Sequence, residues 1–298
     1  MFSASPSSIS RHHPEKVATI KSPVTLHKAE FECALPLIFT SPHSGRVYSD
    51  ELLQRTSLPI DVLRRSEDAY VDQLIDCVPV CGGNLLLAEC PRVFVDVNRG
   101  PWELDPGMFV DRLPDYVDTS SRRAASGLGV VPRIGADGRP LYTKRLRFEE
   151  ARNRLSLYYT PYHKALQMLV DEVKARFGIV VLLDMHSMPN KGSKGADFVL
   201  GNRYGRSCDG RITDQIETLL TGLGFVTLRN TPYAGGYTTE HYSEPNLGVH
   251  VIQIEINRAL YMDERRVVLV PKSKKFKDKL QRFISEFSNY DWVSLLTS

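Results

Sequence analysis

The chain has 298 residues, of which 42% are hydrophobic and 24% are charged, and its formal net charge is +3. This composition is typical of a globular protein with a sizeable core, and the small net charge argues against a nucleic-acid-binding function. No run approaches the ~18 consecutive apolar residues that cross a bilayer, and five cysteines without a CxxC pair favour a reduced, cytoplasmic location over a disulfide framework.

The chain divides into a polar start and one long α/β region. Residues 1–25 are rich in Ser, His, Pro and Arg, which predicts a disordered leader and leaves a targeting segment open. Residues 26–298 contain no linker-like stretch and predict a single α/β domain. Short apolar runs predict strands at residues 37–40, 84–89, 93–97, 179–184, 198–201, 225–228 and 250–256. Amphipathic stretches predict helices at residues 61–78, 147–177, 210–223 and 273–288.

Two stretches are less regular. Thr160 and Pro161 lie inside the longest predicted helix, and a cap residue followed by proline predicts either two helices or a kink. Residues 100–142 are rich in Gly, Pro and Arg and have weak periodicity. We expect this segment to be a long excursion over the rim of the sheet that contacts the substrate and sets substrate choice.

Two histidines follow predicted strands. His43 comes just after residues 37–40, and His186 comes just after residues 179–184. The carboxyl ends of strands form the rim where open α/β sheets keep their active sites, so we expect the two imidazoles to meet there. Catalytic zinc commonly takes two histidines and a carboxylate and leaves a position for water. The pair therefore predicts a site for zinc or another divalent metal.

Two neighbouring acids in the helix predicted at residues 61–78 are candidates for the third ligand. On a helical wheel Glu67 lies inside the apolar stripe, whereas Asp68 lies beyond its edge. A buried acid needs a cation or a hydrogen bond, which favours Glu67. If the helix instead begins near Asp68, that residue caps it and faces the rim. The residues alone leave both acids open, together with the simpler alternative that both lie on the helix surface.

Three further residues indicate how a substrate is held and cleaved. Arg99 ends a predicted strand, and its guanidinium suits a bidentate grip on a carboxylate, with a structural salt bridge as the alternative. Glu255 lies inside a predicted buried strand, where an acid beside a metal is expected to act as a general base. His241 follows a pair of glycines and is a candidate for steadying the substrate or an oxyanion, although an ordinary turn fits equally well.

In their order along the chain, these motifs resemble the N-formylglutamate amidohydrolase family. The resemblance covers residues 37–264, and its matching segments are 41–45, 68, 94–99, 160–163, 184–187, 197–201, 235–236, 241–242 and 253–255. The family is distantly similar to zinc carboxypeptidases and aspartoacylases. The resemblance therefore implies a three-layer α/β/α sandwich around a mixed, mostly parallel sheet, of the phosphorylase/hydrolase-like type.

The resemblance also implies an activity, namely zinc-dependent hydrolysis of an N-acyl amino acid, and in particular of an N-formyl amino acid such as N-formylglutamate. The roles that it implies are metal ligation by His43, Asp68 and His186, a grip on the substrate carboxylate by Asn98 and Arg99, and proton transfer by Glu255. The family carries an aspartate where Asp68 stands, so Asp68 is the preferred third ligand.

Two other functions stay open. One is a carboxypeptidase-like metallopeptidase, and the other is a non-catalytic carboxylate-binding protein of the same fold. Glu255 argues against the second, because binding alone needs no buried acid. In each case the expected partner is a small molecule rather than a nucleic acid or a membrane, and the oligomeric state is left open.

Overall fold

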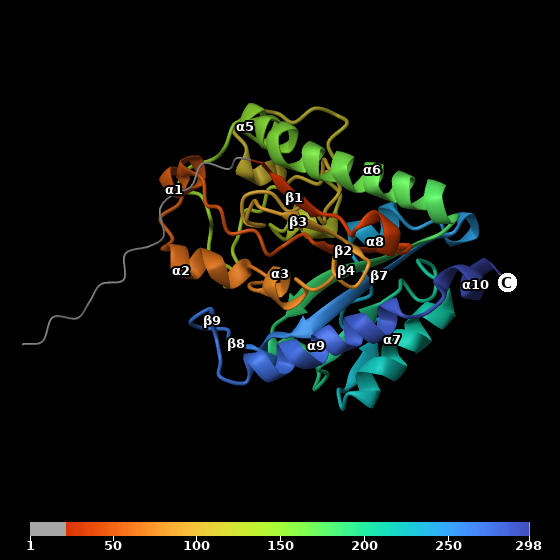
Figure 1. The fold of residues 1–298 in the computed structure, drawn as a ribbon. Coiled ribbons are helices and arrows are strands. Elements are labelled where there is room, and N and C mark those ends of the chain that lie inside the picture. Colours follow the sequence, from red (N-terminus) through yellow and green to blue (C-terminus); the bar gives the residue numbers. More distant parts are fainter. Residues whose placement is uncertain (1–21, 298) are drawn as a thin grey trace, which may run out of the picture.

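A seven-stranded mixed sheet forms the centre of the protein, for which a computed structural model describes residues 22–297 (Figure 1). The strands are β1 (Val24–His27), β2 (Leu37–Ser41), β3 (Asn84–Ala88), β4 (Val180–Met188), β5 (Phe198–Gly201), β6 (Thr227–Arg229) and β7 (Val249–Asn257). Their order is β1-β3-β2-β4-β7-β5-β6. Neighbours are parallel except at β1–β3 and β5–β7, which confirms the mixed, mostly parallel sheet.

Helices cover both faces of the sheet. They are α1 (Asp50–Arg55), α2 (Ile60–Leu63), α3 (Val71–Leu74), α4 (Arg122–Ala125), α5 (Phe148–Arg154), α6 (Thr160–Phe177), α7 (Gly210–Gly222), α8 (Tyr237–His241), α9 (Ser273–Ser288) and α10 (Trp292–Thr297). Figure 1 shows α5 and α6 on one side of the sheet and α7 and α9 on the other. This is the three-layer α/β/α arrangement that the family resemblance implies. A short hairpin, β8 (Met262–Asp263) and β9 (Val268–Leu269), lies outside the main sheet.

The core has two parts, one on each face of the sheet. Alternate residues of a strand point to opposite faces, so Leu182 of β4 packs into the core under α6, whereas Leu183 packs into the core under α7 and α9. Both faces are therefore apolar, and every residue of β4 and β7 is buried. Strands buried on both faces read as continuous apolar runs, which is why the sequence reveals them clearly.

The two central strands pair along their whole length. β4 extends to Met188, four residues beyond the predicted end, because β7 pairs with it from Val180 onward. His186 therefore lies within the strand, two residues before its end, rather than just after it. Its partner in the parallel register is Glu255. A ligand candidate and a base candidate thus lie side by side on the two strands with the longest pairing.

The predicted helix at residues 61–78 is wrong, because the chain breaks between α2 and α3. A short 3₁₀ turn follows α2, Glu67 adopts an extended conformation, and Tyr70 is left-handed with φ of 69°. The backbone N–H of Asp68 donates to the His43 carbonyl oxygen over 3.0 Å instead of to its own helix. This tertiary hydrogen bond holds the break beside the loop that follows β2, so a helical wheel does not describe the two acids.

The predicted strand at residues 93–97 is also wrong. The segment is a buried turn, in which the N–H of Phe94 donates to the Pro91 carbonyl oxygen over 2.8 Å. The N–H of Asp96 donates to the Val130 carbonyl oxygen over 2.8 Å, which ties the turn to the excursion. Its apolar residues pack into the core under α6. The apolar pattern therefore reports burial and not strand pairing.

The remaining predictions differ mainly at their ends. A π-helical turn, Leu155–Tyr159, joins α5 to α6 without a break, so Pro161, which has no N–H to donate, lies directly after the π turn within one continuous helical stretch. β1 begins at Val24, inside the predicted leader, and residues 1–21 of that leader lie outside the described residues. Among the described helices, none is long and apolar enough to span a membrane.

Candidate active site

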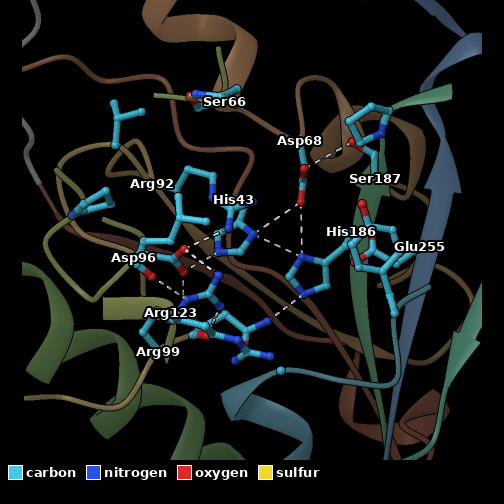
Figure 2. A pocket seen from close by; sticks show the side chains of 18 of the residues that line it. His43, Ser66, Asp68, Arg92, Asp96, Arg99, Arg123, His186, Ser187 and Glu255 are labelled. Carbon is cyan, nitrogen blue, oxygen red and sulfur yellow. Dashed lines mark hydrogen bonds and ion pairs between the residues drawn. The ribbon is translucent and has the colours of Figure 1, made fainter. Parts of the chain in front are cut away.

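A cavity of about 590 Å³ lies at the carboxyl ends of the central strands (Figure 2). Its walls come from the loop after β2, from the ends of β4 and β7, and from the excursion over residues 100–142. A further wall is the segment of residues 232–236, directly before α8. The cavity therefore lies on the rim where the positions of the histidines predicted a site.

His43 is placed by a tight turn after β2. A Cβ atom on Gly45 would lie only 2.4 Å from the backbone oxygen of Cys90, so no larger residue fits there without moving the loop. The His43 carbonyl oxygen accepts the hydrogen bond from Asp68 described above. This hydrogen bond joins the turn to the helix break, and the side chains of His43 and Asp68 both line the cavity.

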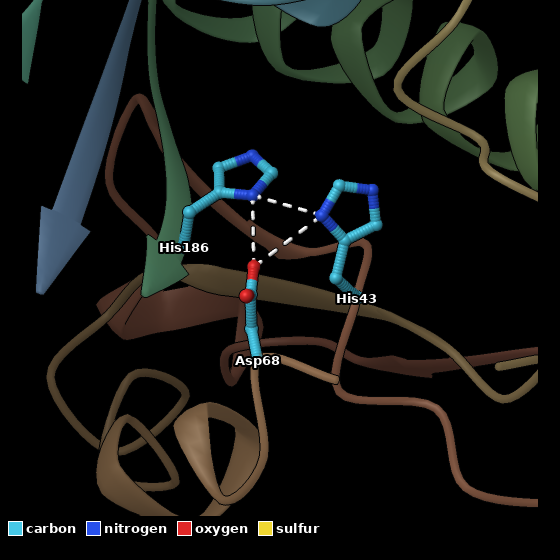
Figure 3. Close-up of side chains that lie close together, drawn as sticks. All are labelled: His43, Asp68 and His186. Atoms are coloured by element: carbon cyan, nitrogen blue, oxygen red, sulfur yellow. Dashed lines mark hydrogen bonds and ion pairs between the residues drawn. The ribbon is translucent and has the colours of Figure 1, made fainter. Parts of the chain in front are cut away.

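Three buried side chains converge in the cavity (Figure 3). The Nδ1 atoms of His43 and His186 are 3.1 Å apart, and Asp68 Oδ2 lies 3.3 Å from the first and 3.1 Å from the second. With zinc–ligand bonds of about 2.0–2.1 Å, the ligand atoms of a tetrahedral site lie roughly 3.4 Å from one another. The triangle therefore has the dimensions and the chemistry of a two-histidine, one-carboxylate metal site.

The far nitrogen of each imidazole is held by another carboxylate. His43 Nε2 lies 2.7 Å from Asp96 Oδ1, and His186 Nε2 lies 2.8 Å from Asp184 Oδ2. Both acids are buried. Metal-binding histidines typically give their second ring nitrogen to such a partner, which fixes the ring and the tautomer. The two Nδ1 atoms are thereby left to face Asp68.

Asp68 is held as a carboxylate. Its second oxygen, Oδ1, accepts from Arg258 Nη2 over 2.9 Å and from the Ser187 hydroxyl over 3.3 Å. Burial opposes ionisation, but hydrogen bonds from His186 and His43 outweigh it and hold the pKa of Asp68 well below its ordinary value. The acid is therefore charged and oriented, as a metal ligand must be.

Glu67 points away from this cluster. Its carboxylate accepts from the Tyr48 hydroxyl over 2.7 Å and lies 3.4 Å from Arg64 Nε. Successive residues of an extended chain point to opposite sides, which is why these two acids separate. Of the two candidates that the sequence left open, the structure brings only Asp68 to the histidines.

Glu255 faces the cavity from β7. Its Oε1 accepts a hydrogen bond from Gln253 Nε2 over 2.8 Å, consistent with the two side chains sharing one face of the strand. The side chain lines the cavity and is only 6% exposed. Burial raises the pKa of Glu255 to about 7. A carboxylate with such a pKa both accepts and releases protons near neutrality, as a general base requires.

Asn98 and Arg99 line the cavity, but their polar groups are already engaged. Asn98 Oδ1 accepts from the N–H of Thr238 over 2.8 Å, so its amide ties the wall before α8 to the histidine side of the cavity. Arg99 donates to the carbonyl oxygens of Leu128 and Asn98, which leaves Nη2 3.8 Å from Asp96. Asn98 is therefore placed to hold the wall, whereas Arg99 keeps one terminal nitrogen for a ligand.

The structure does not bring His241 to the cavity. Its side chain is exposed on α8 and stacks on Tyr237 with ring centroids 4.8 Å apart. The short helix turns it away from the segment of residues 232–236 that does line the cavity. The glycine pair, Gly235 and Gly236, therefore indicated the cavity wall better than His241 did, because glycines allow close approach to a neighbouring group.

Sequence reasoning missed several arginines that line the cavity. Arg92 donates to Asp96 Oδ2 over 2.8 Å, and Arg258 holds Asp68. Arg65 and Arg123 line it as well. A signal existed for Arg258, since it follows the strand that carries Glu255 directly after an asparagine, as Arg99 follows Asn98. Nothing in the local pattern marks the others.

Comparison with known proteins identifies relatives of the whole fold. A family model described as N-formylglutamate amidohydrolase matches residues 35–262, a range that contains all the cavity residues named above. N-formylglutamate deformylase from Pseudomonas putida is 28% identical over 243 residues, which is 77% of this chain and 83% of that protein.

Solved structures give the same picture. The crystal structure of N-formylglutamate amidohydrolase from Ralstonia eutropha JMP134 superposes with a TM-score of 0.85 at 33% identity, covering 90% of this chain and 98% of that one. A gene product from Agrobacterium tumefaciens shares the fold, with a TM-score of 0.62 at 17% identity, covering 89% and 94% of the two chains.

Proposed function

The chain belongs to the N-formylglutamate amidohydrolase family, and we propose that it is a metal-dependent hydrolase that cleaves the amide bond of N-formyl amino acids, N-formylglutamate above all. The observation that carries the proposal is the convergence of His43, Asp68 and His186 beside Glu255 in one buried cavity. The names of the relatives support the choice of substrate.

The proposed metal is zinc, and the ligand atoms would be the two Nδ1 atoms and Asp68 Oδ2. Two histidines and a carboxylate form a common catalytic zinc site, which leaves a position for water. Bound zinc polarises a carbonyl group and lowers the pKa of water. The buried carboxylates behind each histidine suit this assignment, because each binds the second ring nitrogen and so orients the imidazole with Nδ1 toward the metal position.

Glu255 has the proposed role of general base. It takes a proton from the attacking water as the oxygen–carbon bond forms at the formyl carbon. It then gives this proton to the amine nitrogen as the carbon–nitrogen bond breaks, so that formate and the free amino acid leave. The Gln253 amide holds the carboxylate during both transfers. Arg99 binds the α-carboxylate of the substrate through its remaining terminal nitrogen.

The direct test is turnover by the purified chain loaded with zinc. We expect release of formate and glutamate in equal amounts from N-formyl-L-glutamate, measured by NMR, and little release of amino acids from short peptides. Peptide trimming without N-formyl hydrolysis would instead support the metallopeptidase alternative. Binding of N-formylglutamate without any turnover would support a carboxylate-binding protein and contradict the proposal.

The Asp184→Asn substitution is expected to weaken zinc binding by about 10- to 100-fold, because a neutral amide replaces the carboxylate behind His186. The replacement keeps the shape of the side chain, so the fold should survive. Competition with a chromophoric chelator measures the dissociation constant. Asp197→Asn serves as the control, because Asp197 accepts from the N–H of Val226 outside the cavity lining. An equal loss in both variants would contradict the role of Asp184.

The Gly236→Ala substitution is expected to lower kcat/KM by about 10²-fold through displacement of Asn98. A Cβ atom at Gly236 would lie 2.5 Å from Asn98 Nδ2 and 2.6 Å from Oδ1, so the amide must move. The backbone φ of −103° suits alanine, and the effect is therefore steric. Gly210→Ala is the matched control, because no atom of the described part of the chain lies within 4 Å of its added Cβ. Steady-state kinetics of both variants, with thermal unfolding as a check, measures the difference.

A further inference from the structure

The cavity carries more positive than negative side chains. Five arginines line it, namely Arg65, Arg92, Arg99, Arg123 and Arg258. Of the carboxylates in the described residues 22–297, only Asp68, Asp96 and Glu255 do so. A bound divalent cation would add to the excess. A concave site with such a surplus attracts anions, and the arrangement of the arginines tells which anionic groups it can hold.

Most of these arginines already have partners. Arg258 is bound to Asp68 over 2.9 Å, and Arg92 is bound to Asp96 over 2.8 Å. Arg65 lies 3.8 Å from the exposed Asp61 carboxylate. Arg258 and Arg92 are therefore largely neutralised by the protein itself, whereas Arg65 has only this weak pair with an exposed acid and a buried Nε atom without a hydrogen-bond partner.

Arg123 differs from the others. Among the described residues, its guanidinium has no hydrogen-bond or ion-pair partner, although it lines the cavity. Figure 2 shows it at the same end of the cavity as Arg99. Burial and the charges of Arg92 and Arg123 lower the pKa of Arg99, against the opposing effect of Asp96. Two guanidinium groups thus share one end of the cavity, and among the described residues only Arg99 has a carboxylate within 4.0 Å.

The protein fixes the backbone from which the exposed Arg123 side chain reaches the cavity. The residue lies in the first turn of α4, whose preceding residue Ser121 accepts a hydrogen bond from the N–H of Ala124 over 3.4 Å. The Ser121 hydroxyl also donates to Glu103 Oε2 over 2.7 Å. This anchoring holds α4 against the rest of the excursion, so that Arg123 reaches the cavity from a defined backbone position.

We propose that Arg123 binds the side-chain carboxylate of the substrate while Arg99 binds its α-carboxylate, so that the site selects N-formyl amino acids with an acidic side chain. The inference rests on the proposed hydrolase function and adds the residue that sets its specificity. A substrate with one carboxylate leaves one of the two neighbouring cations uncompensated. A substrate with two carboxylates compensates both.

The test compares N-formyl-L-glutamate with N-formyl-L-glutamine, which has the same shape without the side-chain charge. We expect the wild type to favour the glutamate compound by about 10- to 100-fold in kcat/KM. This is the factor that one hydrogen bond to a charged group typically contributes. Arg123→Met should remove this preference by raising KM for the glutamate compound while leaving the glutamine compound unchanged. Arg123→Glu should in addition favour N-formyl-L-lysine.

Arg122→Met is the matched control. Arg122 is the preceding residue of α4, carries the same charge, is exposed and does not line the cavity. This variant should keep the wild-type preference. Equal losses on both substrates in Arg123→Met, or an unchanged preference, would overturn the inference, and thermal unfolding verifies that each variant is folded.

Failure of the inference is distinguishable from failure of the proposed function. If the zinc-loaded wild type hydrolyses both compounds equally well, the hydrolase function stands and the role of Arg123 is wrong. If it hydrolyses neither, the hydrolase function is wrong. Calorimetric binding of L-glutamate and L-glutamine then still tests Arg123, because Arg123→Met should weaken binding of glutamate alone, and equal binding of both by the wild type refutes the inference.

Discussion

Glu255→Gln is expected to lower the turnover of N-formylglutamate by about 10²- to 10⁴-fold without loss of bound metal. Glutamine has the shape of glutamate and keeps an oxygen for the hydrogen bond from Gln253, but it cannot accept the proton of the attacking water. Glu255 is not part of the group of potential ligand atoms, so the metal content should stay at the wild-type level. Steady-state kinetics and elemental analysis of the same sample measure both quantities.

The same substitution carries a pH signature. Burial raises the pKa of Glu255 to about 7, and the base works only when it is ionised. In the wild type, kcat/KM should therefore fall tenfold per pH unit below this pKa, and the charge of a bound metal would move the inflection to lower pH. The residual activity of the variant should lack this acid limb.

Glu67→Gln is the control for Glu255→Gln. Glu67 is also buried, but it pairs with Tyr48 and does not line the cavity. The control variant should retain turnover, even if its stability changes. Full activity of Glu255→Gln, or its loss in the control alone, would remove the assignment of the base.

His186→Ala is expected to abolish both stoichiometric zinc and turnover. The substitution removes one corner of a triangle whose other corners lie 3.1 Å away, and two ligands alone rarely retain zinc. Zinc at 100 times its dissociation constant should stabilise the folded wild type by about 2.7 kcal/mol, and this gain should vanish in the variant. Thermal unfolding with and without zinc, together with elemental analysis after dialysis, measures the effect. A chelator should likewise abolish wild-type turnover, and added zinc should restore it.

His241→Ala is the matched control for the histidine. Its imidazole is exposed on α8 and lies outside the cavity lining, so metal content and turnover should be unchanged. Stoichiometric zinc in His186→Ala would contradict the ligand assignment. Loss of turnover in His241→Ala would instead restore the sequence-based role of that residue in substrate binding.

The parts of the fold that the sequence predicts best are those with uninterrupted patterns. β5 begins and ends as predicted, and α9 does so too, because one is a bounded apolar run and the other an amphipathic stretch. The placement of His43 and His186 followed from strand ends alone, without knowledge of which strands are neighbours. The sheet order then puts β2 beside β4, and this adjacency turns two separate histidines into one cluster.

The parts that failed depend on contacts between distant segments. No local sequence pattern near Asp68 indicates that its N–H donates to the His43 carbonyl oxygen, the hydrogen bond that interrupts the predicted helix. The turn at residues 93–97 has a strand-like pattern because it is buried, and only its hydrogen bond to Val130 shows what covers it. Arg123 lies in a segment without periodicity, so its approach to the cavity follows from the packing of the excursion alone.

The side-by-side placement of His186 and Glu255 on two fully buried strands has an evolutionary consequence. Backbone pairing of β4 with β7 sets the spacing of His186 and Glu255. Arg123, the proposed specificity residue, belongs instead to the excursion over residues 100–142. Mutations in that segment can retune which compounds are accepted while the reaction chemistry is inherited intact. Substitutions within residues 100–142 are therefore expected to change which amides are accepted without altering the reacting groups.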